Sequence, residues 1–316
     1  MEELIEGIKQ KDVRSLAKAI TLVENDHPKK LEFLSQLFPL QKATQYVGIT
    51  GSPGAGKSTL VSRLISHIRS EHLTVAVIAV DPTSPFSGGA LLGDRIRMNE
   101  HFTDEGVFIR SMATRGSLGG LSRATKDALR VCGAFGFDVV IVESVGVGQS
   151  ELDIMKVVDT TAVVLTPNSG DVLQVFKAGI MEIADLFVIN KADLDGVGKL
   201  RGLLKELVKM TDKKDYETAI VRTIASEGKW IDVLWEKITE HYHYLRTTGE
   251  GKDQRKLQLT LEIYDLIREE IWQDVKYFVE KEGLLSRLIE SEDPYERARE
   301  ILTLWKKEGG SHRDKY

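Results

Sequence analysis

Short runs of β-branched and other apolar residues recur along the middle of the chain, and segments with helical spacing separate most of them. This alternation predicts a mostly parallel sheet of the α/β class that helices cover on both faces. Ligands of such folds bind beyond the carboxyl ends of the strands, so residues that follow each run are candidates for chemistry. The predicted strands are Tyr46–Thr50, Thr74–Val80, Val107–Ile109, Asp138–Val142, Thr161–Leu165, Leu186–Ile189 and Ala219–Thr223.

The amino-terminal residues 1–45 have helical periodicity instead. One apolar stripe runs from Leu4 to Val23, and the polar stretch Asn25–Pro28 interrupts it. A second short helix is expected to extend to about residue 41. We interpret this region as a helical extension that packs against the following domain.

The carboxyl-terminal part, residues 246–316, is also predicted to be helical. Gly249–Lys252 is interpreted as a linker, followed by a long amphipathic helix over residues 257–278 and a shorter helix over Pro294–Lys307. A long apolar stripe outside a sheet either packs on it or pairs with another subunit, and we favour pairing. The chain is thus divided into an N-terminal helical extension (1–45), an α/β domain (46–245) and a C-terminal helical arm (246–316).

Composition restricts the setting of the protein. The chain has 316 residues, of which 42% are hydrophobic and 29% charged, as in ordinary soluble proteins. Its net charge of −5 argues against nucleic-acid binding by bulk electrostatics. The single cysteine, Cys132, forms no internal disulfide and is expected to be a small buried residue in a reducing compartment. No signal peptide or membrane-length apolar run is visible, so the expected location is cytoplasmic.

The stretch Gly51–Thr59 lies between the first predicted strand and a segment with helical spacing. It has the form G-x-x-x-x-G-K-[ST] in the strand–loop–helix context of nucleoside-triphosphate sites. Its glycines let successive N–H groups point inward at a helix N-terminus, which forms an anion site. Lys57 is expected to reach the β- and γ-phosphates, and the Ser58 hydroxyl to ligate Mg²⁺. The predicted nucleotide-binding residues here are Gly51, Ser52, Gly54, Ala55, Gly56, Lys57, Ser58 and Thr59.

Acidic residues follow two other predicted strands. Asp81 and Glu143 come directly after strands, and Asp94 lies in the loop that follows Asp81. Carboxylates at strand tips hold Mg²⁺ directly or through water, so these three acids and Ser58 are the candidate metal ligands. A turn-initiating role for Asp81 and a helix-capping role for Asp94 stay open as alternatives. Gly146 follows Glu143 by three residues, as in the DxxG switch of GTPases, and its N–H is expected to bond the γ-phosphate.

The sequence NKAD follows another predicted strand and matches the guanine-reading NKxD loop of GTPases. Asp193 is expected to accept hydrogen bonds from N1–H and the exocyclic amine of guanine, a donor pair that adenine lacks. Asn190 supports the loop, and the aliphatic stem of Lys191 covers the base. Farther on, many GTPases carry Ser-Ala to close over the guanine. Here Ala225 is retained and Ile224 replaces the serine. The contact of this segment with guanine is made largely by backbone atoms, so nucleotide binding is expected to survive the replacement.

These motifs together resemble the MeaB/ArgK family, P-loop GTPases of the SIMIBI class. The similarity spans about residues 46–234, and the order and spacing of its motifs are specific. The residues that carry it are Gly51–Thr59, Val80–Ser84, Gly93–Met98, Ser111–Gly116, Val142–Glu151, Gly170–Gln174 and Gly179–Asp185 with Asn190–Asp193.

The resemblance implies a GTP-hydrolysing chaperone for an adenosylcobalamin-dependent acyl-CoA mutase such as methylmalonyl-CoA mutase. Such proteins gate cofactor loading and protect the mutase from inactivation, and they dimerise through the C-terminal arm. By motif, Lys57, Asp81 and Glu143 are expected to act in hydrolysis with GTP, GDP and Mg²⁺ as ligands. Lys177 lies in a segment that resembles the family's third switch and is a candidate for stabilising phosphate charge when the mutase is bound.

Two other functions compete with this reading. One is a kinase or transport ATPase, as the name ArgK suggests, against which the NKAD loop argues. The other is a nickel- or cobalt-delivery GTPase of the same class. Those proteins carry Cys- or His-rich metal motifs, and no cluster with such spacing is visible in this sequence.

We expect the wild-type chain to bind GTP in preference to ATP, and Asp193→Asn to reduce that preference. The reason is that an amide cannot accept hydrogen bonds from both guanine donors as a carboxylate does. Competition binding with the two nucleotides measures the ratio for each protein. A wild-type preference for ATP would contradict the guanine assignment.

Overall fold

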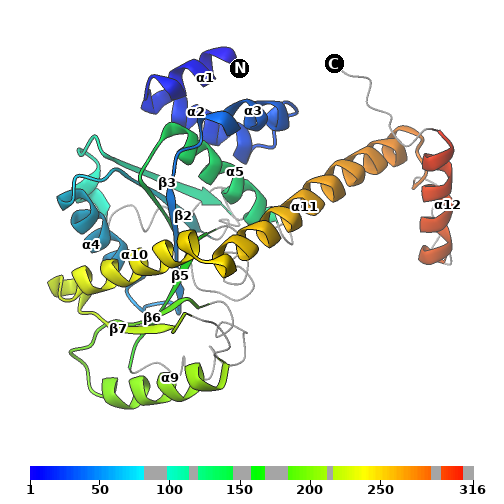
Figure 1. Ribbon diagram of the computed structural model, residues 1–316. Coiled ribbons are helices and arrows are strands. Elements are labelled where there is room, and N and C mark those ends of the chain that lie inside the picture. Colours follow the sequence, from blue (N-terminus) through cyan, green and yellow to red (C-terminus); the bar gives the residue numbers. More distant parts are fainter. Residues whose placement is uncertain are drawn as a thin grey trace. The chain divides into compact units, whose positions relative to one another are not determined.

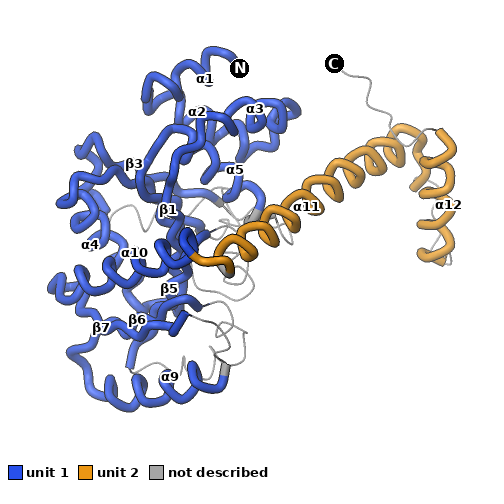
Figure 2. The backbone as a smooth tube through the Cα atoms, viewed as in Figure 1, with its two compact units in different colours: residues 1–247 blue, residues 248–316 orange. Residues whose placement is uncertain are grey.

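The chain forms two units, Met1–Thr247 and Thr248–Tyr316, coloured blue and orange in Figure 2. The computed structural model describes residues 1–81, 98–113, 120–144, 158–167, 184–211, 216–285 and 293–308.

A sheet in the order β3-β2-β4-β1-β5-β6-β7 forms the centre of the first unit (Figure 1). Every neighbouring pair of strands is parallel, so their carboxyl ends lie along one edge. Strand β1 lies in the middle of this edge, between β4 and β5. The predicted strands and α/β class are confirmed. Their bounds are β1 Gln45–Gly51, β2 Val75–Asp81, β3 Val107–Ala113, β4 Val139–Ser144, β5 Thr160–Leu165, β6 Leu186–Ile189 and β7 Ala219–Arg222.

Helices cover both faces of this sheet because successive strand residues point to opposite sides. In β2, Ala76 and Ile78 join a core cluster with α2 and α5, whereas Val75 and Val77 join another with α4 and α10. A third cluster joins α9 to β5 and β6. The helices of this unit are α1 Glu2–Lys9, α2 Val13–Glu24, α3 Lys30–Leu37, α4 Lys57–Ser70, α5 Gly120–Phe135, α9 Val197–Thr211 and α10 Ile231–Thr247, with 3₁₀ turns at Phe38–Leu40 and Ala225–Glu227.

The amino-terminal stripe is divided between two helices, α1 and α2. The chain turns at Lys11, whose φ is +62°, and Asp12 then caps α2 by accepting from the N–H of Ser15 at 2.9 Å. Helix α2 packs on α5 within the first unit, and Arg110 of β3 donates to the Glu24 carboxylate at 2.9 Å. The residues of the expected N-terminal extension thus share one core cluster with the sheet.

Cys132 lies on α5 in the same core cluster, with no exposed surface. Burial raises the pKa of its thiol to about 12 because the thiolate is poorly solvated there. The expectation of a small buried residue is confirmed.

The second unit contains α11 (Gly249–Lys281) and α12 (Pro294–Lys307). The prediction of a linker at Gly249–Lys252 is wrong, because α11 begins there and the Thr248 hydroxyl caps it by accepting from the N–H of Gly251 at 3.2 Å. Toward the end of α11, Val275 and Phe278 pack with Ile301 of α12. The stripe from residue 257 to 271 is exposed by contrast. Its exposed apolar residues are Leu257, Leu259, Leu261, Ile263, Tyr264, Ile267 and Ile271.

None of the helices in the described ranges has the length and apolar character needed to cross a membrane.

We expect Leu16→Ala to lower the free energy of unfolding by about 2–5 kcal/mol, because Leu16 of α2 is fully buried in the core cluster that α2 shares with α5, and its truncation leaves a cavity. Urea denaturation measures the change. Val13→Ala in the same helix is the control: Val13 is 51% exposed, so we expect a change below about 1 kcal/mol. Equal losses for the two variants would show that α2 does not pack as described.

Candidate nucleotide-binding site

The loop between β1 and α4 has a backbone that glycine favours. Gly51, Gly54 and Gly56 have φ values of +134°, +77° and +87°. Gly56 is the N-cap residue of α4, which begins at Lys57, so the first-turn N–H groups, which have no acceptor within the helix, lie next to the loop. The N-terminus of a helix carries partial positive charge, and this arrangement therefore suits a phosphate.

Two of these glycines leave no room for a side chain. A Cβ on Gly56 would lie 2.6 Å from Nδ2 of Asn190, and one on Gly51 would lie 2.0 Å from the carbonyl oxygen of Val164 in β5. The loop is therefore seated directly against the neighbouring strand and against the NKAD segment. More than 100 residues of sequence separate the partners in each of these contacts, so only the fold brings them together.

The Lys57 side chain lies along its own loop. Its ammonium donates to the carbonyl oxygens of Gly51 at 2.6 Å and Ser52 at 3.1 Å, and only 7% of the residue is exposed. These bonds place a positive charge beside the N-terminus of α4. The combination of ammonium and helix N-terminus favours a polyanionic ligand.

An acid from the neighbouring strand reaches the same helix. The Ser58 hydroxyl donates to Oε1 of Glu143 at 2.6 Å, and both residues are buried. Glu143 lies on β4 opposite Ile49 of β1, one strand away from the loop. Next to it, Ser144 donates to the Thr50 hydroxyl at 2.8 Å, which joins β4 to β1 through side chains as well. A hydroxyl and a carboxylate are the oxygen ligands that Mg²⁺ prefers, so this pair fits such an ion.

Asn190 joins three segments at the carboxyl edge of the sheet. Its Nδ2 donates to the carbonyl oxygen of Ala55 at 2.8 Å. Its Oδ1 accepts from the Thr223 hydroxyl and from the N–H of Ala225, each at 3.1 Å. The side chain is 2% exposed, so all of its polar atoms are used within the protein.

The neighbouring residues of the NKAD loop are more open. Lys191 adopts φ +55° and donates from its ammonium to the carbonyl oxygen of Gly54 at 3.0 Å, so its stem crosses above the phosphate loop. The N–H of Ala192 donates to the carbonyl of Thr223 at 3.0 Å. Asp193 follows in a turn and is exposed.

The structure thus brings the phosphate loop, Glu143, the NKAD segment and Ala225 to one edge of the sheet. The remaining predicted site residues are not described. Asp81 is the last residue of β2, but its side chain is outside the described part, and Asp94, Gly146 and Lys177 lie wholly outside it.

Two contacts in this region are not predictable from the sequence pattern. Thr223 directly follows a strand, a position that flagged other site residues, but its hydroxyl bond to Asn190 requires the fold. Arg63 of α4 donates from Nε to the carbonyl oxygen of Ala225 at 3.2 Å. No sequence signal marks Arg63, because an arginine on a helix is ordinarily solvated.

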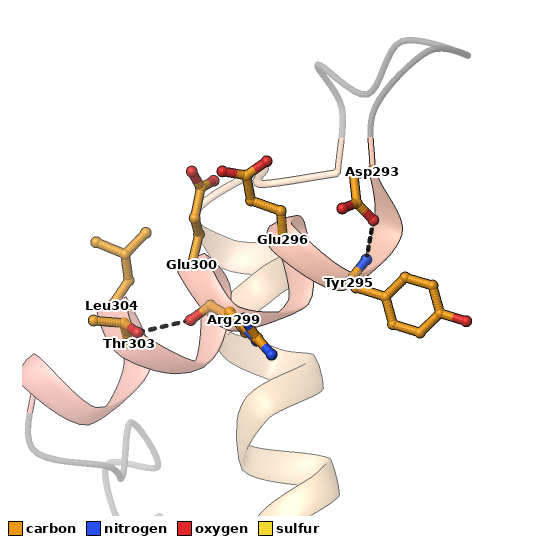
Figure 3. Close-up of a pocket in the computed structure, with 7 residues that line it drawn as sticks. All are labelled: Asp293, Tyr295, Glu296, Arg299, Glu300, Thr303 and Leu304. Atoms are coloured by element: carbon orange, nitrogen blue, oxygen red, sulfur yellow. Dashed lines mark hydrogen bonds between the residues drawn. The ribbon is translucent and has the colours of Figure 1, made fainter.

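A concavity of about 820 Å³ lies elsewhere, on α12 of the second unit (Figure 3). Helix α12 and its cap residue supply the lining: Asp293, Tyr295, Glu296, Arg299, Glu300, Thr303 and Leu304. None of these belongs to the predicted nucleotide site, so the concavity is not that site.

A family model described as methylmalonyl Co-A mutase-associated GTPase MeaB matches residues 16–280. The chain belongs to the MeaB family. The resemblance is therefore confirmed, and the chain is a GTPase that binds guanine nucleotide and hydrolyses GTP.

Individual relatives agree with this assignment. A Pyrococcus horikoshii protein named as a GTPase is 48% identical over 308 residues, covering 96% of this chain and 97% of the relative. The Escherichia coli GTPase ArgK is 38% identical over 267 residues, covering 82% and 81%. The mitochondrial methylmalonic aciduria type A homolog of Mus musculus is 35% identical over 295 residues, covering 87% and 71%.

A solved structure matches the fold of this MeaB-family chain. The crystal structure of a LAO/AO transport system kinase superposes with a TM-score of 0.69 at 28% identity, covering 96% of this chain and 97% of that one. The P-loop fold is thereby confirmed.

We expect Asn190→Ala to lower the free energy of unfolding by about 1–3 kcal/mol, because it leaves the buried Ala55 carbonyl and Ala225 N–H without their side-chain partner. Denaturant titration without nucleotide measures the change. Lys191→Ala is the matched control, because Lys191 is exposed and its loss should cost less than about 0.5 kcal/mol. A greater loss from the lysine variant would refute the role of Asn190 as the buried joint.

Proposed function

We propose that this MeaB-family GTPase is a chaperone for an adenosylcobalamin-dependent acyl-CoA mutase such as methylmalonyl-CoA mutase, gating cobalamin loading and protecting the mutase from inactivation. The observation that carries the proposal is the family match over residues 16–280, whose description names mutase association. The name of the Mus musculus relative supports it, because methylmalonic aciduria points to the same metabolism.

The phosphate side of the proposed mechanism uses Lys57 and the N–H groups of residues 51–58. The Lys57 ammonium bonds the loop carbonyls of Gly51 and Ser52, and in this position it would offset charge on the β- and γ-phosphates of a bound nucleotide. Asp81 and Lys177 complete the proposed catalytic set with Glu143, and the N–H of Gly146 bonds the γ-phosphate. We propose that the γ-phosphate holds the segments that carry these residues in one arrangement and that hydrolysis releases them. The mutase would sense this change.

Mg²⁺ is the proposed cofactor. Ser58 and Glu143 would hold it, since their oxygens lie 2.6 Å apart and both residues are buried, and Asp81 and Asp94 are the other proposed ligands. Bound there, the ion would supply positive charge that offsets the charge developing on the phosphates. Glu143 itself fixes the orientation of the Ser58 hydroxyl at the start of α4.

Guanine recognition is assigned to the NKAD loop and the turn at Ala225. Asp193 accepts from the base, Lys191 covers it, and Asn190 holds both segments against the phosphate loop. This division of work explains why Asn190 is buried and Asp193 exposed.

The arm beyond residue 246 is proposed to form a homodimer. Along α11, Leu257, Leu261, Tyr264 and Ile267 are each at least half exposed at spacings of three or four residues, which places them on one face. A continuous exposed apolar face of this kind fits a second copy of the same helix. We also propose a cytoplasmic location, which suits a chain whose one thiol is unpaired.

The test measures GTP turnover of the isolated chain and of a mixture with a purified adenosylcobalamin-dependent mutase. We expect slow intrinsic turnover and acceleration of at least about tenfold by the mutase, equivalent to about 1.4 kcal/mol of barrier. Lys57→Ala should reduce both rates by at least about 100-fold, the scale seen when a charge-stabilising group is removed. Lys205→Ala, an exposed lysine of α9, is the control and should leave both unchanged. Fast turnover alone with no response to any mutase would count against the chaperone role.

A further inference from the structure

Arg63 connects the phosphate-binding helix to the turn beside the base site. It lies on α4, six residues after Lys57, and its guanidinium reaches two successive carbonyl oxygens of the 3₁₀ turn. Nε donates to the oxygen of Ala225 at 3.2 Å, and Nη2 donates to the oxygen of Ser226 at 3.4 Å. A planar guanidinium suits two adjacent acceptors, whereas an ammonium is a point donor.

The contact with Ala225 also determines where the next amide points. The chain has no cis peptide bond among its described residues, and in a trans peptide the C=O and N–H of one plane point in opposite directions. The carbonyl of Ala225 shares its plane with the N–H of Ser226. The N–H of Gly228 also donates to this carbonyl, at 3.3 Å, so Arg63 and the bond within the turn together direct the Ser226 N–H to the side away from the guanidinium.

The preceding amide is already engaged. The N–H of Ala225 donates to Oδ1 of Asn190 at 3.1 Å, so it is used in fastening the turn to the NKAD loop. The N–H of Glu227 donates back to the Ile224 carbonyl at 3.0 Å. Within the part of the chain that the structure describes, the intervening Ser226 N–H bonds no protein acceptor.

We propose that Arg63 is a positioning residue for guanine recognition, and that it orients the Ala225–Ser226 peptide so that the Ser226 N–H donates to O6 of guanine. The inference rests on the proposed placement of the base between this turn and the NKAD loop. Guanine presents an acceptor at O6 where adenine presents an amino donor. A fixed N–H at this point therefore favours guanine and opposes adenine, in addition to the contacts of Asp193.

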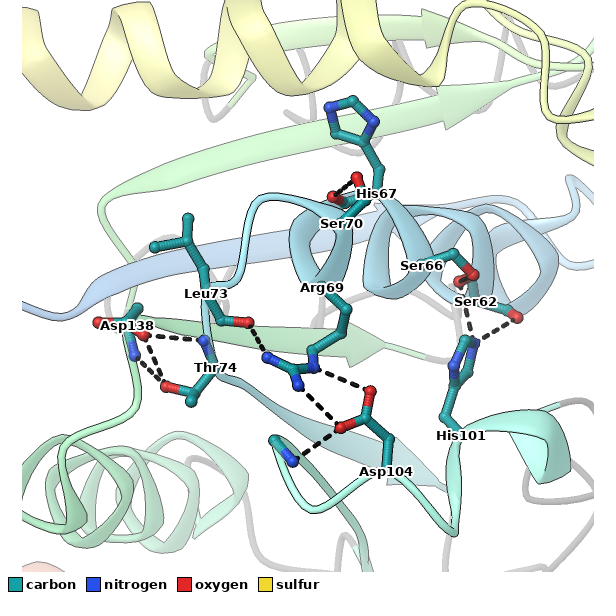
Figure 4. Close-up of polar contacts among 11 residues, drawn as sticks. Ser62, Ser66, His67, Arg69, Ser70, Leu73, Thr74, His101, Asp104 and Asp138 are labelled. Carbon is teal, nitrogen blue, oxygen red and sulfur yellow. Dashed lines mark hydrogen bonds and ion pairs between the residues drawn. The ribbon is translucent and has the colours of Figure 1, made fainter.

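The position of Arg63 is secured by its surroundings. Glu100 faces it, and the pKa of this carboxyl is lowered chiefly by the hydrogen bond from Ser62, with Arg63 and His101 contributing. Ser62 also lies 3.0 Å from Nε2 of His101, as drawn in Figure 4. The hydrogen bonds that join Ser62 to Glu100 and His101 hold the middle of α4 in place, directly next to Arg63.

The experiment compares Arg63→Met with wild type for binding of GDP and of 2-aminopurine riboside diphosphate, which keeps the 2-amine of guanine but lacks O6 and the N1–H. Loss of the N1–H weakens the contact with Asp193 equally in both proteins, so the effect of the substitution on each Kd is compared rather than the Kd values themselves. Diphosphates avoid hydrolysis during the titration. We expect the variant to raise the Kd for GDP about tenfold and the Kd for the O6-lacking analogue less than about threefold. Arg63→Lys should give an intermediate loss for GDP, because one donor remains.

The matched control is Arg69→Met on the same helix. Arg69 also donates to a backbone carbonyl, that of Leu73 at 2.7 Å, and pairs with Asp104 at 2.9 Å, at the other end of α4 (Figure 4). Its loss should leave the ratio of the two Kd values unchanged even if it lowers stability.

Equal weakening of both nucleotides by Arg63→Met, or no weakening of either, would overturn the positioning role. An altered ratio in the Arg69→Met control would overturn it as well. Failure of the underlying base site looks different: wild type itself would then bind GDP no more tightly than ADP, whatever occupies position 63.

Discussion

The side-chain amide of Asn190 is the joint on which the nucleotide edge depends. It occupies the space that a side chain on Gly56 would need, and it bonds the phosphate loop on one side and the turn at Ala225 on the other. Because the amide is buried, each of these bonds replaces one to water, and losing any of them leaves a buried group unsatisfied. The phosphate and base sides of the site are consequently held in one geometry before any ligand contact is made.

The sheet makes this joint possible. Parallel strands place β1, β4 and β6 with their carboxyl ends at one edge, so loops far apart in sequence converge there. The Ser58–Glu143 bond and the Lys57 contacts use the same convergence on the phosphate side. Helices on both faces bury the strands, and the edge is left for polar side chains.

Periodicity predicted the seven strands and most helices because buried strands and amphipathic helices leave strong patterns. The phosphate loop and NKAD were also readable, since their chemistry demands particular residues at fixed spacing. The linker at Gly249–Lys252 was misjudged: two glycines lower helix propensity locally, but the Thr248 cap and the long helix that follows outweigh this cost. Contacts such as Arg63 to Ala225 were beyond prediction, because they depend on where two distant segments meet.

The one thiol of the chain gives this architecture a practical property. Cys132 is enclosed by the core cluster on α5, and its pKa of about 12 keeps it protonated at ordinary pH. Maleimides and disulfide reagents attack thiolates that they can reach, so the folded chain offers them no target of its own. A cysteine introduced on the exposed face of α11 would be modified alone. The molecule is thus ready for spectroscopic distance probes without prior removal of native cysteines.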